Sequence, residues 1–287
     1  MEMIYESALL TIEKVRNFRY MISDVFMPNK DLLKKNSNLK GALKGKRCFI
    51  LGNAPSLNEQ DLSLLKDEFV ITVNQIARNK QFKDIKTDIH FWADPGFFNE
   101  ENTNDEFIEV MKGVVSEDNC PMVFYPLSAK RFVENHELDK YLNIHYFSPL
   151  YSFHGKYKRN IDFCKGIPGF YTVVEYGITL AIYMGASEIY IMGCDCTGIV
   201  NTLKSFQDEV TDEYAYEISE EEKKRMKKMQ EANLLENHFY SWYKTLQHYR
   251  YLYEYCYARN IKLVNCTKGG VLRDLPREKY EDVIMRK

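Results

Sequence analysis

The stretch Phe49–Leu57, which reads FILGNAPSL, decides the fold of this chain. An apolar run ends at Gly52, and Pro55 suits a first helical turn, where a missing N–H costs nothing. A strand that turns directly into a helix is the unit of parallel α/β sheets, and such a turn directs free N–H groups to the carboxyl edge of the sheet. The stretch therefore predicts an anion-binding turn, or alternatively a plain structural turn capped by Asn53 or Ser56.

The rest of the chain alternates between strand-like and helix-like patterns. Strands alternating with helices predict an α/β fold with a mainly parallel, doubly wound, Rossmann-like sheet over residues 45–287. The predicted strands are 47–51, 69–73, 89–93, 122–125, 144–147, 188–192 and 261–265, and the predicted helices are 57–66, 172–184 and 240–259.

Two segments depart from this alternation. Residues 1–44 have helical spacing and a basic polar face, which predicts a helical prefix that either packs on the domain or contacts an anionic membrane or a partner. Residues 199–236 are dense in charge and interrupt the rhythm between a strand and the last long helix. We interpret them as an insertion that forms a mobile flap, or else a solvated surface helix.

Composition narrows the classes of protein. The net charge is −2 and the isoelectric point is near 6.3, which gives no overall charge for binding nucleic acid. The seven cysteines are scattered without a CxxC pair, so we expect reduced thiols and no metal site. No apolar run is long enough for a membrane span, and no signal peptide pattern opens the chain, so we expect a cytoplasmic protein.

Polar residues follow several predicted strands. Asn74, Asp94 and Asp195 each come shortly after an apolar run, and Thr267 and Gly269 follow the last one. The carboxyl ends of parallel strands share one edge of the sheet, so we expect these residues to converge on one ligand. Each alone is also a common turn residue.

Two further residues are candidates for chemistry near this edge. Thr172 precedes the apolar helix 173–184 and is a plausible N-cap, so we expect this helix end at the same edge of the sheet. His238 lies where the insertion meets the long helix, and histidine is the usual general base near neutral pH. His248 is the alternative base, and the Asp195 carboxylate could hold a hydroxyl or a metal or act as a base.

Three motifs together resemble the family of 6-hydroxymethylpterin diphosphokinase MptE-like proteins. They are Gly52–Leu57, Gly193–Asp195 and Asn265–Gly270, and the likeness covers roughly residues 45–280. The first motif, the following Asn74-Gln75 and the Asp94-Pro95 turn are also similar to bacterial family 42 sialyltransferases.

The resemblance implies roles for individual residues. Gly52, Asn53 and Ser56 would meet the phosphate and ribose of a nucleotide, while Asn74 and Asp94 would help to hold it. Ala54 replaces a family glycine and keeps this turn narrow.

The sequence also departs from the sialyltransferase pattern. Val173 and Val174 stand where those enzymes have Ser-Gly, and the phosphate-binding tyrosines expected soon after Asp195 are absent. Tyr214 or Tyr216 in the insertion could replace those tyrosines.

The resemblance leads to one main functional hypothesis. The protein would transfer a sialic acid-like sugar from a CMP-activated donor to a glycan or surface-polysaccharide acceptor, without a required cofactor or metal. It could form homo-oligomers and stay near a membrane-bound acceptor through its N-terminal helices. The alternatives are an ATP- and Mg²⁺-dependent 6-hydroxymethylpterin diphosphokinase, with Asp94 and Asp195 as metal ligands, and a non-catalytic relative.

Overall fold

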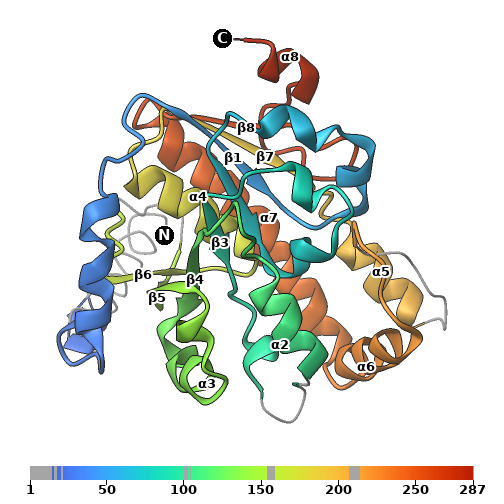
Figure 1. Cartoon of the computed structure of the whole chain (residues 1–287), viewed down its shortest axis with the longest axis horizontal. Coiled ribbons are helices and arrows are strands. Elements are labelled where there is room, and N and C mark those ends of the chain that lie inside the picture. Colours follow the sequence, from blue (N-terminus) through green and yellow to red (C-terminus); the bar gives the residue numbers. More distant parts are fainter. Residues whose placement is uncertain are drawn as a thin grey trace, which may run out of the picture.

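The computed structural model describes residues 15, 18–20, 22–99, 103, 105–153, 159–206 and 214–286. In this part of the chain, eight strands pair in parallel and form one sheet. The predicted α/β fold with a parallel sheet is therefore confirmed (Figure 1). The strands are β1 Arg47–Leu51, β2 Val70–Val73, β3 Ile89–Phe91, β4 Met122–Pro126, β5 Asn143–Ser152, β6 Gly166–Gly169, β7 Glu188–Met192 and β8 Lys262–Asn265.

The order of the strands creates a switch point in the middle of the sheet. The order is β6-β5-β4-β3-β2-β1-β7-β8, so the chain leaves β1 in one direction for β2 to β6 and returns on the other side of β1 for β7. The connections that follow β1 and β7 therefore diverge at the carboxyl edge. In open α/β sheets such a divergence forms the crevice in which ligands bind.

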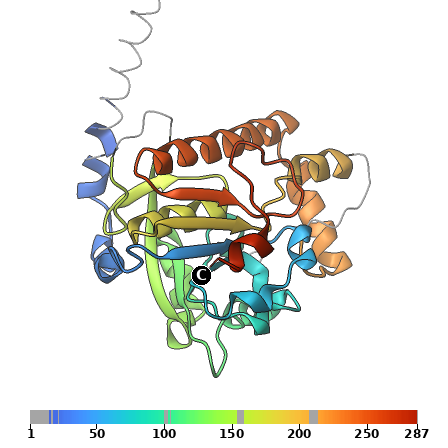
Figure 2. The ribbon, with the colours of Figure 1, turned by 90° about the horizontal axis from the view of Figure 1, so that it is seen from above.

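Helices and turns cover both faces of the sheet. On one face α4 and α7 pack against it, and on the other α2, α3 and several 3₁₀ turns do so (Figures 1 and 2). The α-helices are α2 Asp105–Lys112, α3 Lys130–Asn135, α4 Val173–Tyr183, α5 Gly198–Ser205, α6 Glu220–Glu231, α7 Leu235–Tyr257 and α8 Tyr280–Ile284. The 3₁₀ segments are η1 Lys30–Leu39, η2 Pro55–Glu59, η3 Leu62–Leu65, η4 Asn74–Arg78, η5 Phe82–Asp84, η6 Pro95–Phe98, η8 Leu127–Ala129 and η9 Leu138–Lys140.

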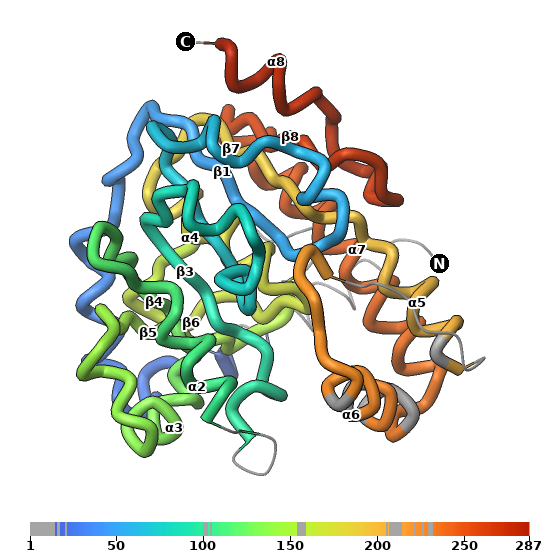
Figure 3. The backbone as a smooth tube through the Cα atoms, turned by 45° about the vertical axis from the view of Figure 1, so that its right-hand side comes forward, coloured from blue at the N-terminus to red at the C-terminus, as the bar shows by residue number. Residues whose placement is uncertain are grey.

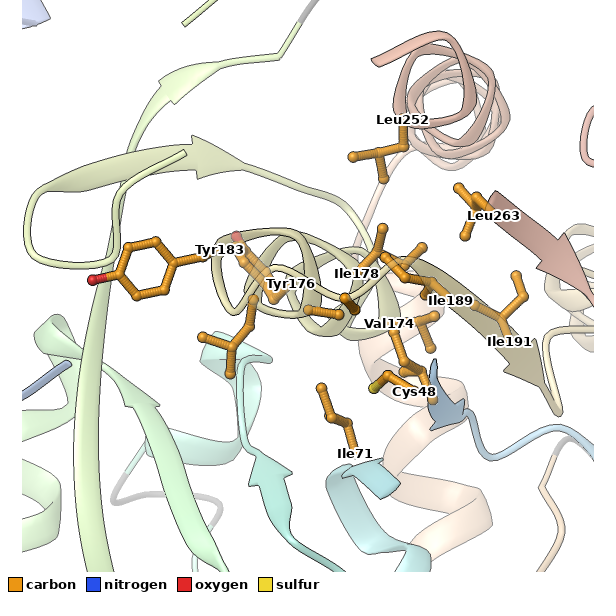
Figure 4. Close-up of a cluster of buried hydrophobic side chains, with 14 of the residues drawn as sticks. Cys48, Ile71, Val174, Tyr176, Ile178, Tyr183, Ile189, Ile191, Leu252 and Leu263 are labelled. Carbon is orange, nitrogen blue, oxygen red and sulfur yellow. The ribbon is translucent and has the colours of Figure 1, made fainter. Parts of the chain in front are cut away.

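The helix α4 lies between the sheet and α7 and is buried nearly all round. Figure 4 shows Ile178 of this helix among buried side chains of the sheet and of α7, such as Ile71 and Leu252. A Cβ atom added at Gly177 would lie 3.0 Å from Cγ2 of Ile50, so this glycine lets α4 approach β1 closely. The burial of α4 fixes where its N-terminus meets the carboxyl edge of the sheet.

Several predicted elements differ from the structure. The helix expected over 57–66 is wrong, because Pro55 and the short loop confine this connection to the two 3₁₀ turns η2 and η3. The strand β6 was not predicted, since Gly166–Gly169 lacks apolar alternation and pairs only at the sheet edge. The insertion 199–236 contains α5 and α6, which lie beside the start of α7 (Figure 3).

The helical prefix is present in the described residues. Residues 18–20 and 22–25 are helical and η1 follows, whereas the predicted helix within 1–14 lies outside the described residues. No helix among the described residues combines the length and apolar character that crossing a membrane requires. All seven cysteines are free thiols.

Shortening a side chain at the centre of the α4 interface tests this packing. Ile178→Ala should lower the free energy of unfolding by about 2–5 kcal/mol, because it leaves a cavity between α4 and its neighbours. Ile182→Ala, on the same helix but only partly buried, should cost clearly less. Chemical denaturation of both variants measures the difference, and equal losses would contradict the described burial.

Candidate functional site

A pocket of about 270 Å³ opens at the switch point of the sheet. Its walls come from the turns after β1, β2 and β7, from the N-terminus of α4, from α5 and from α7. No lysine or arginine is among the described residues that line it. The lining residues are Gly52, Asn53, Ala54, Val73, Asn74, Thr172, Val173, Val174, Gly193, Cys194, Asp195, Cys196, Thr197, Gly198, Asn201, Tyr214, Trp242 and Tyr249.

The floor of the pocket depends on close contact between two glycines. The N–H of Gly52 donates to the Met192 carbonyl at 2.8 Å, and the N–H of Ala54 donates to the Gly193 carbonyl at 3.1 Å. A Cβ atom at Gly52 would lie 2.3 Å from the Gly193 oxygen, and Gly193 itself has a φ of 61°. Only glycine fits this approach, which keeps the two turns together.

Two asparagine side chains in the pocket have unsatisfied oxygen atoms. The Asn53 amide nitrogen donates to the Val73 carbonyl at 3.1 Å, which leaves its Oδ1 without a hydrogen bond. The Oδ1 of Asn74 is also buried and without a partner, and this residue has a φ of 50°. An unsatisfied buried acceptor is costly, so each of these two atoms has hydrogen-bonding capacity that the described residues leave unused.

Both oxygens of the Asp195 carboxylate accept hydrogen bonds from Ser56. Ser56 Oγ donates a short hydrogen bond to Oδ1 of Asp195, and the Ser56 N–H donates to Oδ2 at 3.3 Å. Ser56 is buried and does not line the pocket, although Asp195 does. These contacts tie the start of η2 to the turn after β7.

The turn after β8 supports the pocket from behind. Thr267 Oγ1 accepts the Cys194 N–H at 3.0 Å, and a Cβ atom at Gly270 would lie 2.7 Å from the Asp195 Cα. Arg277 donates to the carbonyl of Gly269 at 2.5 Å. Thr267 and Gly269 do not line the pocket. Thr267 instead holds the Asp195 turn through the Cys194 N–H, and Gly269 contacts Arg277.

A buried Glu–His pair stands behind the N-terminus of α4. Thr172 is the N-cap, as predicted, and Glu175 accepts the N–H groups of Tyr171 and Thr172 at 3.1 and 2.8 Å. The other Glu175 oxygen lies 3.6 Å from Nδ1 of His248, and neither atom has a hydrogen bond. Burial raises the pKa of Glu175 to about 8, and burial lowers the pKa of His248 to about 4. At neutral pH both groups are therefore uncharged.

Two aromatic residues of α7 complete the wall. Tyr249 is buried with its hydroxyl 3.2 Å from the Thr172 hydroxyl. Trp242 packs so tightly on Gly198 that a Cβ atom there would lie 2.2 Å from its ring. Neither residue was predicted as part of the site, because a run of aromatic residues in a helix is equally typical of core packing.

Besides Ser56, Thr267 and Gly269, two more predicted site residues do not line the pocket, Asp94 and His238. Asp94 caps η6 by accepting the Gly96 N–H at 2.9 Å, and it follows β3, two strands away from β1. His238 lies one turn before Trp242 on α7, with its ring centroid 6.1 Å from that of Phe206. His238 therefore lies nearer the N-terminus of α7 than Trp242 does, outside the residues that line the pocket.

The segment 214–217 of the insertion is fastened over the pocket, and we call it the strap. The Ala215 N–H donates to the Asn53 carbonyl at 2.7 Å, and Tyr214 lines the pocket. Arg78 donates to both carboxylate oxygens of Glu222 at 2.8 and 3.0 Å and to the Glu217 carbonyl at 2.9 Å. A half-buried arginine therefore holds the strap and the first turn of α6.

The described residues contain no cluster of three or more histidine, cysteine, aspartate or glutamate side chains that could hold a metal ion. The Asp195 carboxylate could contribute one ligand at most. The diphosphokinase alternative would use Asp94 and Asp195 together. Asp94 accepts the Gly96 N–H, whereas Asp195 accepts the Ser56 hydroxyl, so the two carboxylates share no partner.

Fold and site together define an α/β protein with a pocket at the switch point of a parallel sheet. Residues 23–199 match the family described as 6-hydroxymethylpterin diphosphokinase MptE-like. This match covers more than half of the chain, which therefore belongs to that family. No curated protein matches the chain.

Several solved structures are similar to the chain at low identity. The sialyltransferase CstII from Campylobacter jejuni, in complex with cytidine-5′-monophosphate as a substrate analogue, is 17% identical with a TM-score of 0.42, covering 82% of this chain and 85% of that chain. The monofunctional α-2,3-sialyltransferase Cst-I from the same organism is 14% identical with a TM-score of 0.43, covering 81% and 79%. The MAf glycosyltransferase from Magnetospirillum magneticum AMB-1 is 14% identical with a TM-score of 0.46, covering 87% and 38%.

The buried carboxyl of Glu175 makes stability depend on pH. Between its ordinary pKa and about 8, the folded protein holds a proton that the unfolded chain releases, so stability falls as pH rises through this window. The lowered pKa of His248 has the opposite effect from about pH 4 to 6.5, which leaves a net fall above pH 6.5.

Glu175→Gln should remove that fall, because glutamine can take the same place in the cap without ionising. We expect the wild-type protein to lose about 1 kcal/mol per pH unit relative to the variant between pH 6.5 and 8. Denaturant titrations at several pH values measure this, and parallel curves for the two proteins would contradict it.

Arg78→Ala should release the strap. The variant loses a half-buried ion pair, so amide hydrogen exchange in residues 214–222 should accelerate about tenfold or more. Lys80→Ala is the matched control, because the Lys80–Glu217 pair is 88% exposed on both sides and should matter little. If the amide hydrogens of this segment exchange at the same rate in both variants, Arg78 does not hold the strap.

Proposed function

We propose that this protein is a transferase that binds a nucleotide-activated substrate in the switch-point pocket, and that the substrate is a CMP-activated sugar. The observation that carries the proposal is the pair of unsatisfied oxygens on Asn53 and Asn74 beside the N-terminus of α4. A ribose has hydroxyl donors and cytosine has an amino donor, and both suit these acceptors.

The charge of the pocket supports a nucleotide with a single phosphate. Val173 and Val174 line it with the first turn of α4, whose N–H groups lack partners within the helix. Together with the Thr172 hydroxyl, this helix end suits an anion. A sugar nucleotide with one phosphodiester charge needs no cationic side chain, whereas a triphosphate would place several charges near Asp195.

The proposed reaction joins an acceptor hydroxyl to the anomeric carbon of the donor sugar. The hydroxyl oxygen attacks that carbon, the bond from the carbon to the phosphate oxygen breaks, and CMP leaves with the electron pair. The helix end of α4 stabilises the charge that develops on the leaving phosphate. His238 accepts the proton of the acceptor hydroxyl.

His238 suits the role of base better than His248 does. His248 is buried behind α4 next to Glu175, and its lowered pKa of about 4 makes it a weak base. His238 is half-buried near the start of α7, one turn before Trp242 in the pocket wall. An acceptor that entered along this helix would meet His238 first.

A second candidate function follows from the family match. The family description names 6-hydroxymethylpterin diphosphokinase, which would transfer diphosphate from ATP with Mg²⁺. In that reaction Asp195 would be a ligand of the metal and would have to exchange its contact with Ser56. Selective binding of ATP in the presence of Mg²⁺ would favour this function over glycosyl transfer.

Nucleotide binding separates the two functions. A thermal-shift panel of CMP, CDP, UDP, GDP and ATP, each with and without Mg²⁺, should show stabilisation by CMP that does not depend on the metal. Asn74→Gly should weaken CMP binding by about tenfold, since glycine keeps the positive φ and removes the acceptor. Asn143→Ala, an exposed asparagine on β5, is the control and should bind CMP normally.

The base is tested with the same assays. His238→Ala should leave CMP binding nearly intact and abolish transfer of the sugar, because no base then takes the proton from the attacking hydroxyl. A fully active variant would remove His238 from the mechanism. A protein that no nucleotide stabilises would contradict both candidate functions and favour a non-catalytic relative.

A further inference from the structure

The N-terminal helix presents an apolar surface that nothing in the described structure covers. The exposed side chains are large, and the spacing from Phe18 to Ile22 to Val25 and Phe26 places them on one side of a helix. We call these four residues together with Val15 the apolar stripe. Their exposed fractions run from 42% for Ile22 to 79% for Phe26.

The opposite side of this helix is attached to the sheet edge. The Tyr20 ring lies 5.5 Å from that of Tyr151 at the end of β5, and Asp24 Oδ1 accepts the Gly166 N–H of β6 at 2.7 Å. Figure 2 shows the start of the described chain, in blue, beside this edge of the molecule. The attachment fixes which side faces the body, so the apolar stripe faces outward.

Positive charge surrounds the helix. Residues 15–46 contain eight lysines and arginines but two acids, within a chain whose net charge is −2. Both acids pair with lysines, Asp24 with Lys30 and Asp31 with Lys34. The excess charge on this segment is therefore strongly positive.

Further cations lie at the foot of the same helix. Tyr20 and Asp24 line a hollow of about 690 Å³ together with Lys40, Arg159 and Lys165. All three cations are exposed, and no ion pair of the Lys40 or Arg159 side chain occurs among the described residues. These basic side chains therefore lie beside the attached side of the helix, opposite the apolar stripe.

From this combination we infer that the N-terminal helix docks the protein on an anionic lipid bilayer, with the apolar stripe in the boundary between headgroups and acyl chains. A helix with an apolar face and flanking lysines and arginines has the chemistry of an interfacial helix. Each cation near an anionic surface adds to the attraction. A second copy of the chain is a poorer occupant, because pairing two stripes would bring two strongly basic segments together.

Vesicle co-sedimentation of the full chain tests this inference. The wild-type protein should pellet with vesicles of equal parts phosphatidylcholine and phosphatidylserine and far less with phosphatidylcholine alone. The double variant Phe18→Ser with Phe26→Ser should reduce partitioning about tenfold or more, because it removes two large apolar contacts. Arg19→Glu with Lys40→Glu should reduce it by a similar factor and leave weaker salt dependence.

The controls keep the test specific to the stripe. Tyr257→Ser and Met285→Ser change side chains that are 74% and 72% exposed elsewhere, and they should not alter binding. Every changed side chain is exposed, so melting temperatures should stay close to wild type. The inference is overturned if the wild-type protein stays in solution with both vesicles, or if the stripe variants bind as the controls do. A concentration-dependent dimer that the stripe variant abolishes would assign the surface to a second copy.

Discussion

The close approach of the turns after β1 and β7 is the constraint on which the site depends. Gly52 and Gly193 allow backbone contact where any side chain would collide, and the hydrogen bonds between these turns hold them together. Ser56 then ties its helical turn to Asp195, and Gly270 packs on the same residue. Three turns that are far apart in the chain, after β1, β7 and β8, thus form one rim of the sheet. The pocket exists because the strand order diverges at this point.

The α4 N-terminus reaches this rim because of its burial. An apolar helix packed between the sheet and α7 has no freedom to shift, so the position of Thr172 is set by the core. The uncharged pair of Glu175 and His248 continues this packing up to the pocket wall without placing a net charge behind it. A helix end aimed into a pocket without cations offers a fixed dipole for an anion, which is the electrostatic basis of the proposed leaving-group stabilisation.

The sequence predicted most of the sheet and six of the eighteen residues that line the pocket, for identifiable reasons. Asn53, Asn74 and Asp195 come within three residues of the ends of β1, β2 and β7, which lie next to one another, so their convergence follows from parallel topology. Asp94 also follows a strand, but β3 is two places from β1, and neighbouring strands are about 4.8 Å apart. Trp242 and Tyr249 lie on a helix, where their aromatic spacing is the same for packing and for binding. Their place in the pocket wall could be predicted only by knowing which face of α7 meets the switch point.

We propose above all that the switch-point pocket is a nucleotide site whose unsatisfied amide oxygens receive the ligand. A crystal structure of the protein with CMP tests it most directly. We predict the nucleoside within hydrogen-bonding distance of Oδ1 of Asn53 and Oδ1 of Asn74, with its phosphate at the first turn of α4. A nucleotide bound elsewhere on the chain, or a pocket that stays without CMP but takes ATP with Mg²⁺ on Asp195, would contradict the account.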